Sequence, residues 1–251
     1  MNEVVLLIGH GTRDAEGVAE LRAFAARLNQ TIGEQRPVYL CFLEQAEPSV
    51  MEMIERCVAG GAKRIIAIPF LLLAANHVKN DLANLIDLAR RQHTQVEIRF
   101  GGPIGLQPLL LEILADQLAA VEQVYPSRFT PAETALLLAR FGNNDPEANR
   151  EVYKLARLLW EGRGYGWMEV TFLSNAKPNL PEAIERCRAL GARRVVVLPY
   201  ILFTGLLIKR LHTIIAQLSE QYPNVELVCA NYLGQHPRLV ELAHFQLAQV
   251  T

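Results

Sequence analysis

The stretch that decides the fold is FLEQAEP at residues 42–48, because the chain repeats it as FLSNAKP at residues 172–178. The match continues without a gap through IERC at 54–57 and 184–187 and ends at Pro69 and Pro199. A match at constant spacing indicates a tandem duplication. We therefore expect an N-terminal lobe over residues 1–125, a linker over residues 126–133 and a C-terminal lobe over residues 134–251.

Each repeat alternates short apolar runs with helical patterns. Strands are expected at residues 4–9, 38–43, 65–72 and 96–100, and again at residues 135–139, 168–173, 195–201 and 225–229. Strands that alternate with helices of this length are typical of parallel sheets covered by helices on both faces. The pattern predicts an α/β protein of two doubly wound lobes. Each lobe is expected to hold a mainly parallel four-stranded sheet, with the active-site cleft between the lobes.

Composition excludes several classes of partner. The chain has 25 Lys and Arg against 26 Asp and Glu, so it lacks the basic surface of a general nucleic-acid binder. Its longest apolar stretches, near residues 67–75 and 195–203, are far shorter than the ~20 residues of a membrane span. The four cysteines form no Cys-x-x-Cys pair, which favours buried thiols in a reducing compartment. We expect a cytoplasmic protein with no nucleic-acid or membrane partner.

Polar residues follow three strands of the first repeat. His10 follows the first strand, Glu44 the second, and Asn76 and His77 come after the third. In open parallel sheets, ligands bind beyond the carboxyl ends of the strands, so these residues are expected to converge. Two imidazoles and a carboxylate bind divalent transition metals and also transfer protons. The pattern predicts a metal and proton-transfer site in the first lobe.

The second repeat provides an internal control. His10 is replaced there by Phe141, Glu44 by Ser174 and His77 by Leu207, whereas structural residues such as the strand-end proline are retained. Loss of all three together indicates one active lobe and one supporting lobe.

His10 has two other interpretations, as part of a tight turn and as a phosphatase histidine. Gly9-His10-Gly11 is also compatible with a simple tight turn, since glycine tolerates positive φ. A histidine phosphatase needs an Arg immediately before its histidine to hold the phosphate, and Gly9 occupies that place.

The chain resembles the class II tetrapyrrole chelatases, and within them the long, two-lobed sirohydrochlorin chelatases. The resemblance is carried by LIGHGTRD at residues 7–14, FLE at 42–44, PFLLLAANHVKND at 69–81, PYILFTG at 199–205 and YLGQHP at 232–237. It implies insertion of Fe²⁺ or Co²⁺ into sirohydrochlorin without ATP, toward siroheme or cobalamin. By this resemblance, His10 and His77 are catalytic and metal-binding, Glu44 is their acidic partner, and the ion is a substrate rather than a permanently bound cofactor.

The implied substrate carries many carboxylates, which calls for cationic and N–H donors around the site. The residues expected to bind it are Arg13, Asn76, Lys79, Thr204, Gly205, Lys209 and Arg210, together with the backbone N–H groups at the helix starts after Thr12 and Thr204. A non-catalytic carrier of a tetrapyrrole or a metal, using the same cleft, is the alternative function. We expect a monomer, because the duplication supplies both lobes within one chain.

Overall fold

The computed structural model describes residues 3–34, 36–73, 76–142, 145–174 and 176–250, apart from the side chains of residues 76–79. The first half contains β1 (Glu3–Gly9), α1 (Ala15–Ile32), β2 (Val38–Phe42), α2 (Val50–Ala59), β3 (Arg64–Pro69), α3 (Asn76–Gln92), β4 (Glu97–Phe100) and α4 (Pro108–Val124). The second half contains the 3₁₀ turn η1 (Pro131–Glu133), β5 (Thr134–Arg140), α5 (Pro146–Trp160), β6 (Trp167–Phe172), α6 (Leu180–Ala189), β7 (Arg194–Pro199), α7 (Leu206–Gln221), β8 (Glu226–Cys229), the 3₁₀ turn η2 (Leu233–Gln235) and α8 (Leu239–Val250).

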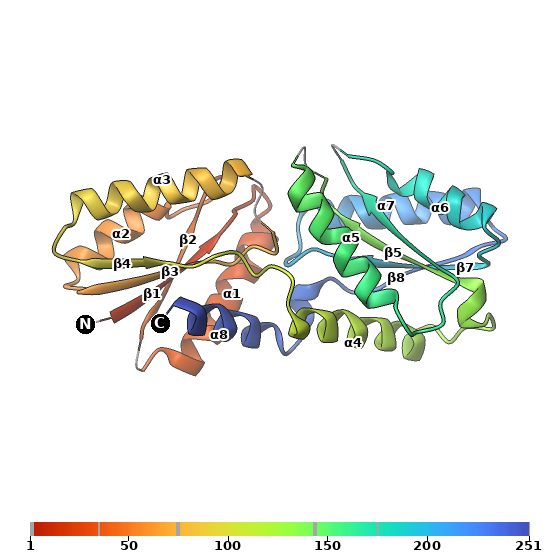
Figure 1. Ribbon diagram of the computed structural model, residues 1–251, viewed down its shortest axis with the longest axis horizontal. Helices are drawn as coiled ribbons and strands as arrows, with labels where there is room; N and C mark the ends of the chain where they lie inside the picture. The colour runs from red at the N-terminus through yellow and green to blue at the C-terminus, as the bar shows by residue number, and fades with distance from the viewer. Residues whose placement is uncertain (1–2, 35, 74–75, 143–144, 175, 251) are drawn as a thin grey trace. The chain divides into compact units, whose positions relative to one another are not determined.

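Two four-stranded sheets confirm the predicted fold class. Their strand orders are β2-β1-β3-β4 and β6-β5-β7-β8, and every neighbouring pair is parallel. In the first sheet, α2 and α3 cover one face while α1 and α8 cover the other (Figure 1). The matching orders show that the sequence repeat is also a structural repeat.

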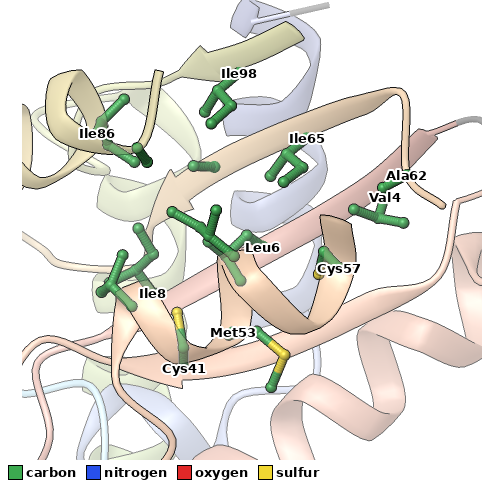
Figure 2. Close-up of a cluster of buried hydrophobic side chains, with 14 of the residues drawn as sticks. Val4, Leu6, Ile8, Cys41, Met53, Cys57, Ala62, Ile65, Ile86 and Ile98 are labelled. Atoms are coloured by element: carbon green, nitrogen blue, oxygen red, sulfur yellow. The ribbon is translucent and has the colours of Figure 1, made fainter. Parts of the chain in front are cut away.

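The strands form because their side chains are buried on both faces. Residues 4–8 of β1 are all fully buried, as expected for a strand between two helical layers. Val4, Leu6 and Ile8 pack with Met53 and Cys57 of α2 on one face, and Figure 2 shows this cluster. The alternate residues of β1 point toward the other layer, because successive side chains of a strand point to opposite faces.

The cysteines belong to these packed layers. All four thiols are free, and Cys57 and Cys187 are buried at equivalent positions of α2 and α6. Burial raises the pKa of the Cys57 thiol to about 11 and that of Cys187 to about 12, because the apolar surroundings disfavour a thiolate. They are therefore core residues, as the sequence indicated.

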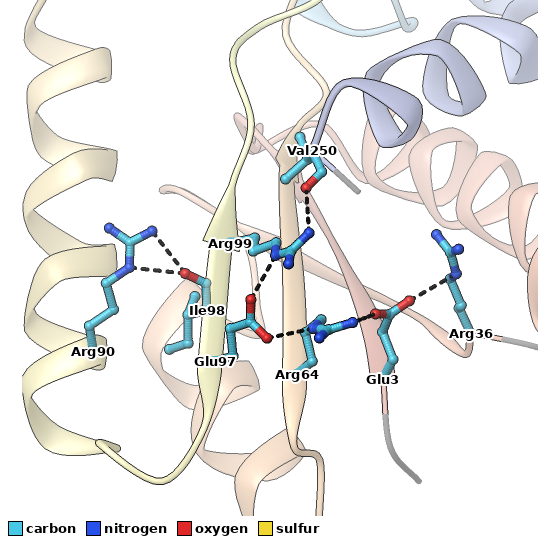
Figure 3. Close-up of polar contacts among 8 residues, drawn as sticks. All are labelled: Glu3, Arg36, Arg64, Arg90, Glu97, Ile98, Arg99 and Val250. Atoms are coloured by element: carbon cyan, nitrogen blue, oxygen red, sulfur yellow. Dashed lines mark hydrogen bonds and ion pairs between the residues drawn. The ribbon is translucent and has the colours of Figure 1, made fainter.

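Charged side chains gather where the strands of the first sheet begin. Arg64 of β3 lies in register with Glu3 of β1 and Glu97 of β4. Its guanidinium contacts both carboxylates, at 2.9 and 2.7 Å (Figure 3). Arg36 and Arg99 extend the network. These charges lie at the opposite end of the sheet from His10 and Glu44, which follow the carboxyl ends of their strands.

The compact units differ from the expected lobes at their closing helices. Unit 1 comprises Met1–Gly105 and Pro237–Thr251, and unit 2 comprises Leu106–His236. Helix α8 packs on β3 and α1, whereas α4 packs on β7 and α5. Gln246 of α8 donates its side-chain N–H groups to the backbone oxygens of Pro69 and Gly102, each at 2.9 Å.

The expected boundaries at residues 1–125, 126–133 and 134–251 therefore need correction. The segment 126–133 lies inside unit 2, where Gly166 N donates to Pro131 O at 3.1 Å. The chain passes between the units after Gly105 and again after His236. The physical reason is that each closing helix carries an apolar stripe that it buries against the sheet of the other repeat.

No helix in the described part of the chain has the length and apolarity needed to cross a membrane. The expected cleft between the lobes stays a prediction.

Because each closing helix packs on the sheet of the other repeat, a cavity in α4 or α8 should destabilise that other sheet. Leu118 of α4 and Leu247 of α8 are equivalent in the repeat and similarly buried. Leu247→Ala should speed amide hydrogen exchange in β3 and α1, and Leu118→Ala in β7 and α5, because each cavity costs about 2–5 kcal/mol locally. Leu190→Ala, at an exposed leucine, should change neither. Faster amide hydrogen exchange in β7 and α5 of Leu247→Ala would contradict the packing of α8 on the sheet of unit 1.

Candidate functional site

The carboxyl ends of β1 and β2 continue side by side into their loops. Leu43 N donates to Gly9 O at 2.9 Å, and Glu44 N donates to His10 O at 3.0 Å. These bonds extend the parallel pairing past the last strand residues, Gly9 and Phe42. His10 and Glu44 therefore lie next to each other because of backbone geometry.

Gly11 is required by this close approach. Its φ is +95°, and a Cβ atom at this position would lie 1.7 Å from the backbone oxygen of Glu44. Both the positive φ and the lack of space exclude an L side chain. The glycine after His10 is therefore structural: it allows the Glu44 loop to reach the His10 loop.

The His10 and Glu44 side chains lie in direct polar contact. His10 Nδ1 lies 3.3 Å from Glu44 Oε1, and both side chains are about half exposed, at 49% and 50%. Gln45 Nε2 also donates to Glu44 Oε1, at 3.2 Å. The carboxylate thus has two polar neighbours and still faces solvent, so it is accessible to an ion or a proton donor.

These two residues line a pocket of about 450 Å³ within unit 1. Leu43 lies on the same side, and the other lining residues that the structure describes come from α3: Asp81, Asn84, Leu85 and Leu88. The volume is within the range of small-molecule sites. Asp81 and Asn84 were not predicted from the sequence as site residues. Their spacing from His77, at four and seven residues along one helix, is the signal that indicates them.

Three predicted site residues lie at the start of α3. The backbone of Asn76, His77 and Lys79 belongs to the first turn of this helix, but their side chains lie outside the described residues. Position 77 is one turn before Asp81, a residue of the pocket lining. Among the side chains that are described, no group of three or more His, Cys, Asp or Glu is placed to hold a metal ion.

Unit 2 repeats part of this backbone arrangement with different side chains. Leu173 N donates to Arg140 O at 2.8 Å, equivalent to the Leu43–Gly9 bond. The Phe141 side chain is 42% exposed. The hydroxyl of Ser174 is buried and has no hydrogen-bond partner in the described structure. The strand-end bond is thus present in both units, whereas the bond from Glu44 N to His10 O and the imidazole–carboxylate pair belong to unit 1 among the described residues.

The residues expected to bind carboxylates lie in both units. Arg13 is exposed in the loop that follows His10. Thr204 and Gly205 precede α7, and Lys209 and Arg210 are exposed in its first turns.

The helix start after Thr12 differs from the expectation. Asp14 Oδ1 accepts hydrogen bonds from the backbone N–H groups of Glu16 and Gly17, at 3.0 and 3.3 Å. Asp14 is thus the N-cap of α1. Its carboxylate accepts hydrogen bonds from backbone N–H groups that were expected to bind a substrate carboxylate.

Comparisons with known proteins identify the family of this chain. The CbiX family model matches residues 4–121 and 135–250. A sirohydrochlorin cobaltochelatase of Priestia megaterium is 41% identical over 94% of this chain and 76% of its own length. A sirohydrochlorin ferrochelatase of the same organism is 33% identical over 98% of this chain and 89% of its own length.

A solved structure described as SirB from Bacillus subtilis with Fe³⁺ superposes with a TM-score of 0.82. It is 26% identical and covers 99% of this chain and 95% of its own. A structure of the sirohydrochlorin chelatase SirB from Bacillus subtilis subspecies spizizenii in complex with cobalt has a TM-score of 0.79 and 25% identity, over 99% of this chain and 95% of its own. With a matching segment in each half of its duplicated fold, the chain belongs to the CbiX family.

Proposed function

We propose that this protein is a sirohydrochlorin chelatase, which inserts Fe²⁺ or Co²⁺ into sirohydrochlorin without ATP. The observation that carries the proposal is the 3.3 Å contact between His10 and Glu44 in a pocket of about 450 Å³. Unit 2 repeats the strand-end bond but has Phe141 and Ser174 in place of this pair of side chains. The sirohydrochlorin cobaltochelatase and ferrochelatase relatives support the choice of substrate and of the two ions. Imidazole and carboxylate ligands suit both ions.

His10 and His77 bind the incoming ion. Because Nδ1 of His10 faces Glu44, the carboxylate favours the tautomer with its proton on Nδ1 and leaves the Nε2 lone pair for the metal. His77 begins α3, where the positive end of the helix dipole disfavours a charged imidazole. A neutral ring is the form that binds a metal. Two imidazoles hold an ion weakly enough to release it, unlike a set of four thiolates.

Glu44 handles protons as well as the ion. Insertion replaces two pyrrole N–H bonds with bonds to the metal, so two protons leave the macrocycle as the ion leaves its imidazole and water ligands. The Glu44 carboxylate accepts one proton, and an imidazole freed from the metal accepts the other. Leu43, Leu85 and Leu88 line the same pocket and displace water around the reacting groups, which strengthens the electrostatic interactions there.

Unit 2 has a supporting role in this proposal. Lys209, Arg210, Thr204 and Gly205 bind substrate carboxylates, together with Arg13, Asn76 and Lys79 of unit 1. We also propose that the enzyme acts as a monomer in the cytosol. The duplicated chain supplies two equivalent units, and its four free thiols fit a reducing compartment.

Substitutions in the imidazole–carboxylate site should abolish insertion while the protein stays folded. His10→Ala and His77→Ala should each lower kcat/KM by at least about 100-fold, and Glu44→Gln by about 10- to 100-fold, because each removes a metal ligand or a proton acceptor. The measurement is anaerobic absorbance of purified protein with sirohydrochlorin and Fe²⁺ or Co²⁺, corrected for the uncatalysed rate.

Two matched variants serve as controls for that assay. His212→Ala removes an exposed histidine of α7, and Ser174→Ala changes the unit 2 counterpart of Glu44. Both should keep the rate within about twofold of wild type. Unchanged rates in His10→Ala and His77→Ala would reject the site. Spectral changes on binding sirohydrochlorin, with no rate above the uncatalysed one, would instead identify a carrier.

Gly11 and Gly142 offer a test of the backbone contact itself. A Cβ atom at Gly142 would lie 2.1 Å from Ser174 O, and one at Gly11 would lie 1.7 Å from Glu44 O. Gly11→Ala and Gly142→Ala should therefore each lower Tm through strain of at least about 1–3 kcal/mol. Below both transitions, Gly11→Ala should lose most of its insertion rate because it displaces Glu44, whereas Gly142→Ala should retain its own. Equal losses of insertion rate in the two variants would show that activity does not depend on the close approach of Gly11 to Glu44.

A further inference from the structure

The described lining of the pocket beside His10 includes more acidic than basic side chains. Two carboxylates, Glu44 and Asp81, line it, and the described lining residues include no Lys or Arg. Other carboxylates on nearby elements are paired: Asp87 contacts Arg90 at 3.0 Å, and Glu97 contacts Arg64 at 2.7 Å. Asp81 forms no ion pair within the described part of the structure.

The α3 side of the pocket is a single helix face. Asp81, Asn84, Leu85 and Leu88 are spaced by three and four residues, so they project along one side of α3. Asp81 and Asn84 are exposed, so a hydrated ion in solvent can reach them. Leucine side chains beside the two carboxylates lower the local dielectric constant and strengthen their field.

This charge selects between the two substrates of the proposed reaction. A divalent cation is attracted to a cavity with two carboxylates, whereas a macrocycle with many carboxylates is repelled by it. The substrate carboxylates must therefore bind elsewhere, and this side of the pocket is suited to the ion.

We infer that Asp81 is a positioning residue for the metal substrate, which draws the hydrated ion to the pocket mouth and holds it there before His10 and Glu44 bind it. Asn84 assists by accepting hydrogen bonds from the water shell of the ion through its amide oxygen. This inference rests on the proposed chelatase function and adds the route by which the ion enters.

A charge series at the two positions tests the inference. Asp81→Asn should raise KM for Co²⁺ about threefold to tenfold at low ionic strength, with kcat unchanged at saturating metal and KM for sirohydrochlorin unchanged or lower. Asn84→Asp, which adds a carboxylate to the same face, should lower KM for Co²⁺. Both effects should shrink near 1 M salt, where the Debye length is about 3 Å. Asp81→Glu, which keeps the carboxylate, should have the wild-type KM for Co²⁺.

Two further measurements separate the possible outcomes. Asp87→Asn removes a carboxylate of α3 outside the pocket lining and should leave KM for Co²⁺ unchanged. Calorimetric titration of the protein with Co²⁺, without sirohydrochlorin, should show weaker binding in Asp81→Asn by a similar factor. If the wild-type rate depends on His10 but neither Asp81→Asn nor Asn84→Asp changes KM for Co²⁺, only this inference is rejected. If His10→Ala retains the wild-type rate, the proposed function itself is rejected.

Discussion

The hydrogen bond from Glu44 N to His10 O is the contact on which the site depends. It extends the pairing of β1 and β2 beyond the last strand residues and places the two side chains 3.3 Å apart. The contact exists because residue 11 is a glycine, since any Cβ atom there would overlap the Glu44 carbonyl. Backbone geometry thus positions the imidazole and the carboxylate before any ion arrives, and such preorganisation lowers the cost of binding it.

Duplication separates this scaffold from its chemistry. Unit 2 has the same strand order and repeats the strand-end bond, from Leu173 N to Arg140 O, but Phe141 and Ser174 occupy the positions of His10 and Glu44. The two ends of the strands also differ in role, with stabilising charges at the amino ends and binding residues at the carboxyl ends. Charged residues stabilise the amino ends: Arg64 bridges Glu3 and Glu97, and the fully buried Arg194 contacts Glu122 at 3.3 Å. The carboxyl ends of unit 1 are left for binding, so changes there need not disturb the network that holds the strands together.

Most of the fold was predictable from the sequence because strands buried on both faces leave a strong local signal. The apolar runs identified all eight strands of the described structure within a few residues. The destination of the closing helices was not predictable in the same way. Helices α4 and α8 have similar apolar stripes and buried glutamines, Gln117 and Gln246, and a local pattern does not specify which sheet a stripe covers. His10 and Glu44 were found because they directly follow strands, whereas Asp81 and Asn84 lie within a helix, where exposed polar residues are common.

The central claim is that a single pocket, in unit 1, receives the metal substrate. The most direct test is anomalous diffraction from crystals of the protein soaked with Co²⁺, without sirohydrochlorin. We predict one strong cobalt peak within coordination distance of His10, inside the pocket that Glu44 and Asp81 line, and none beside Phe141 and Ser174. A cobalt site held by other residues, with the His10 pocket empty in protein that still catalyses insertion, would contradict it.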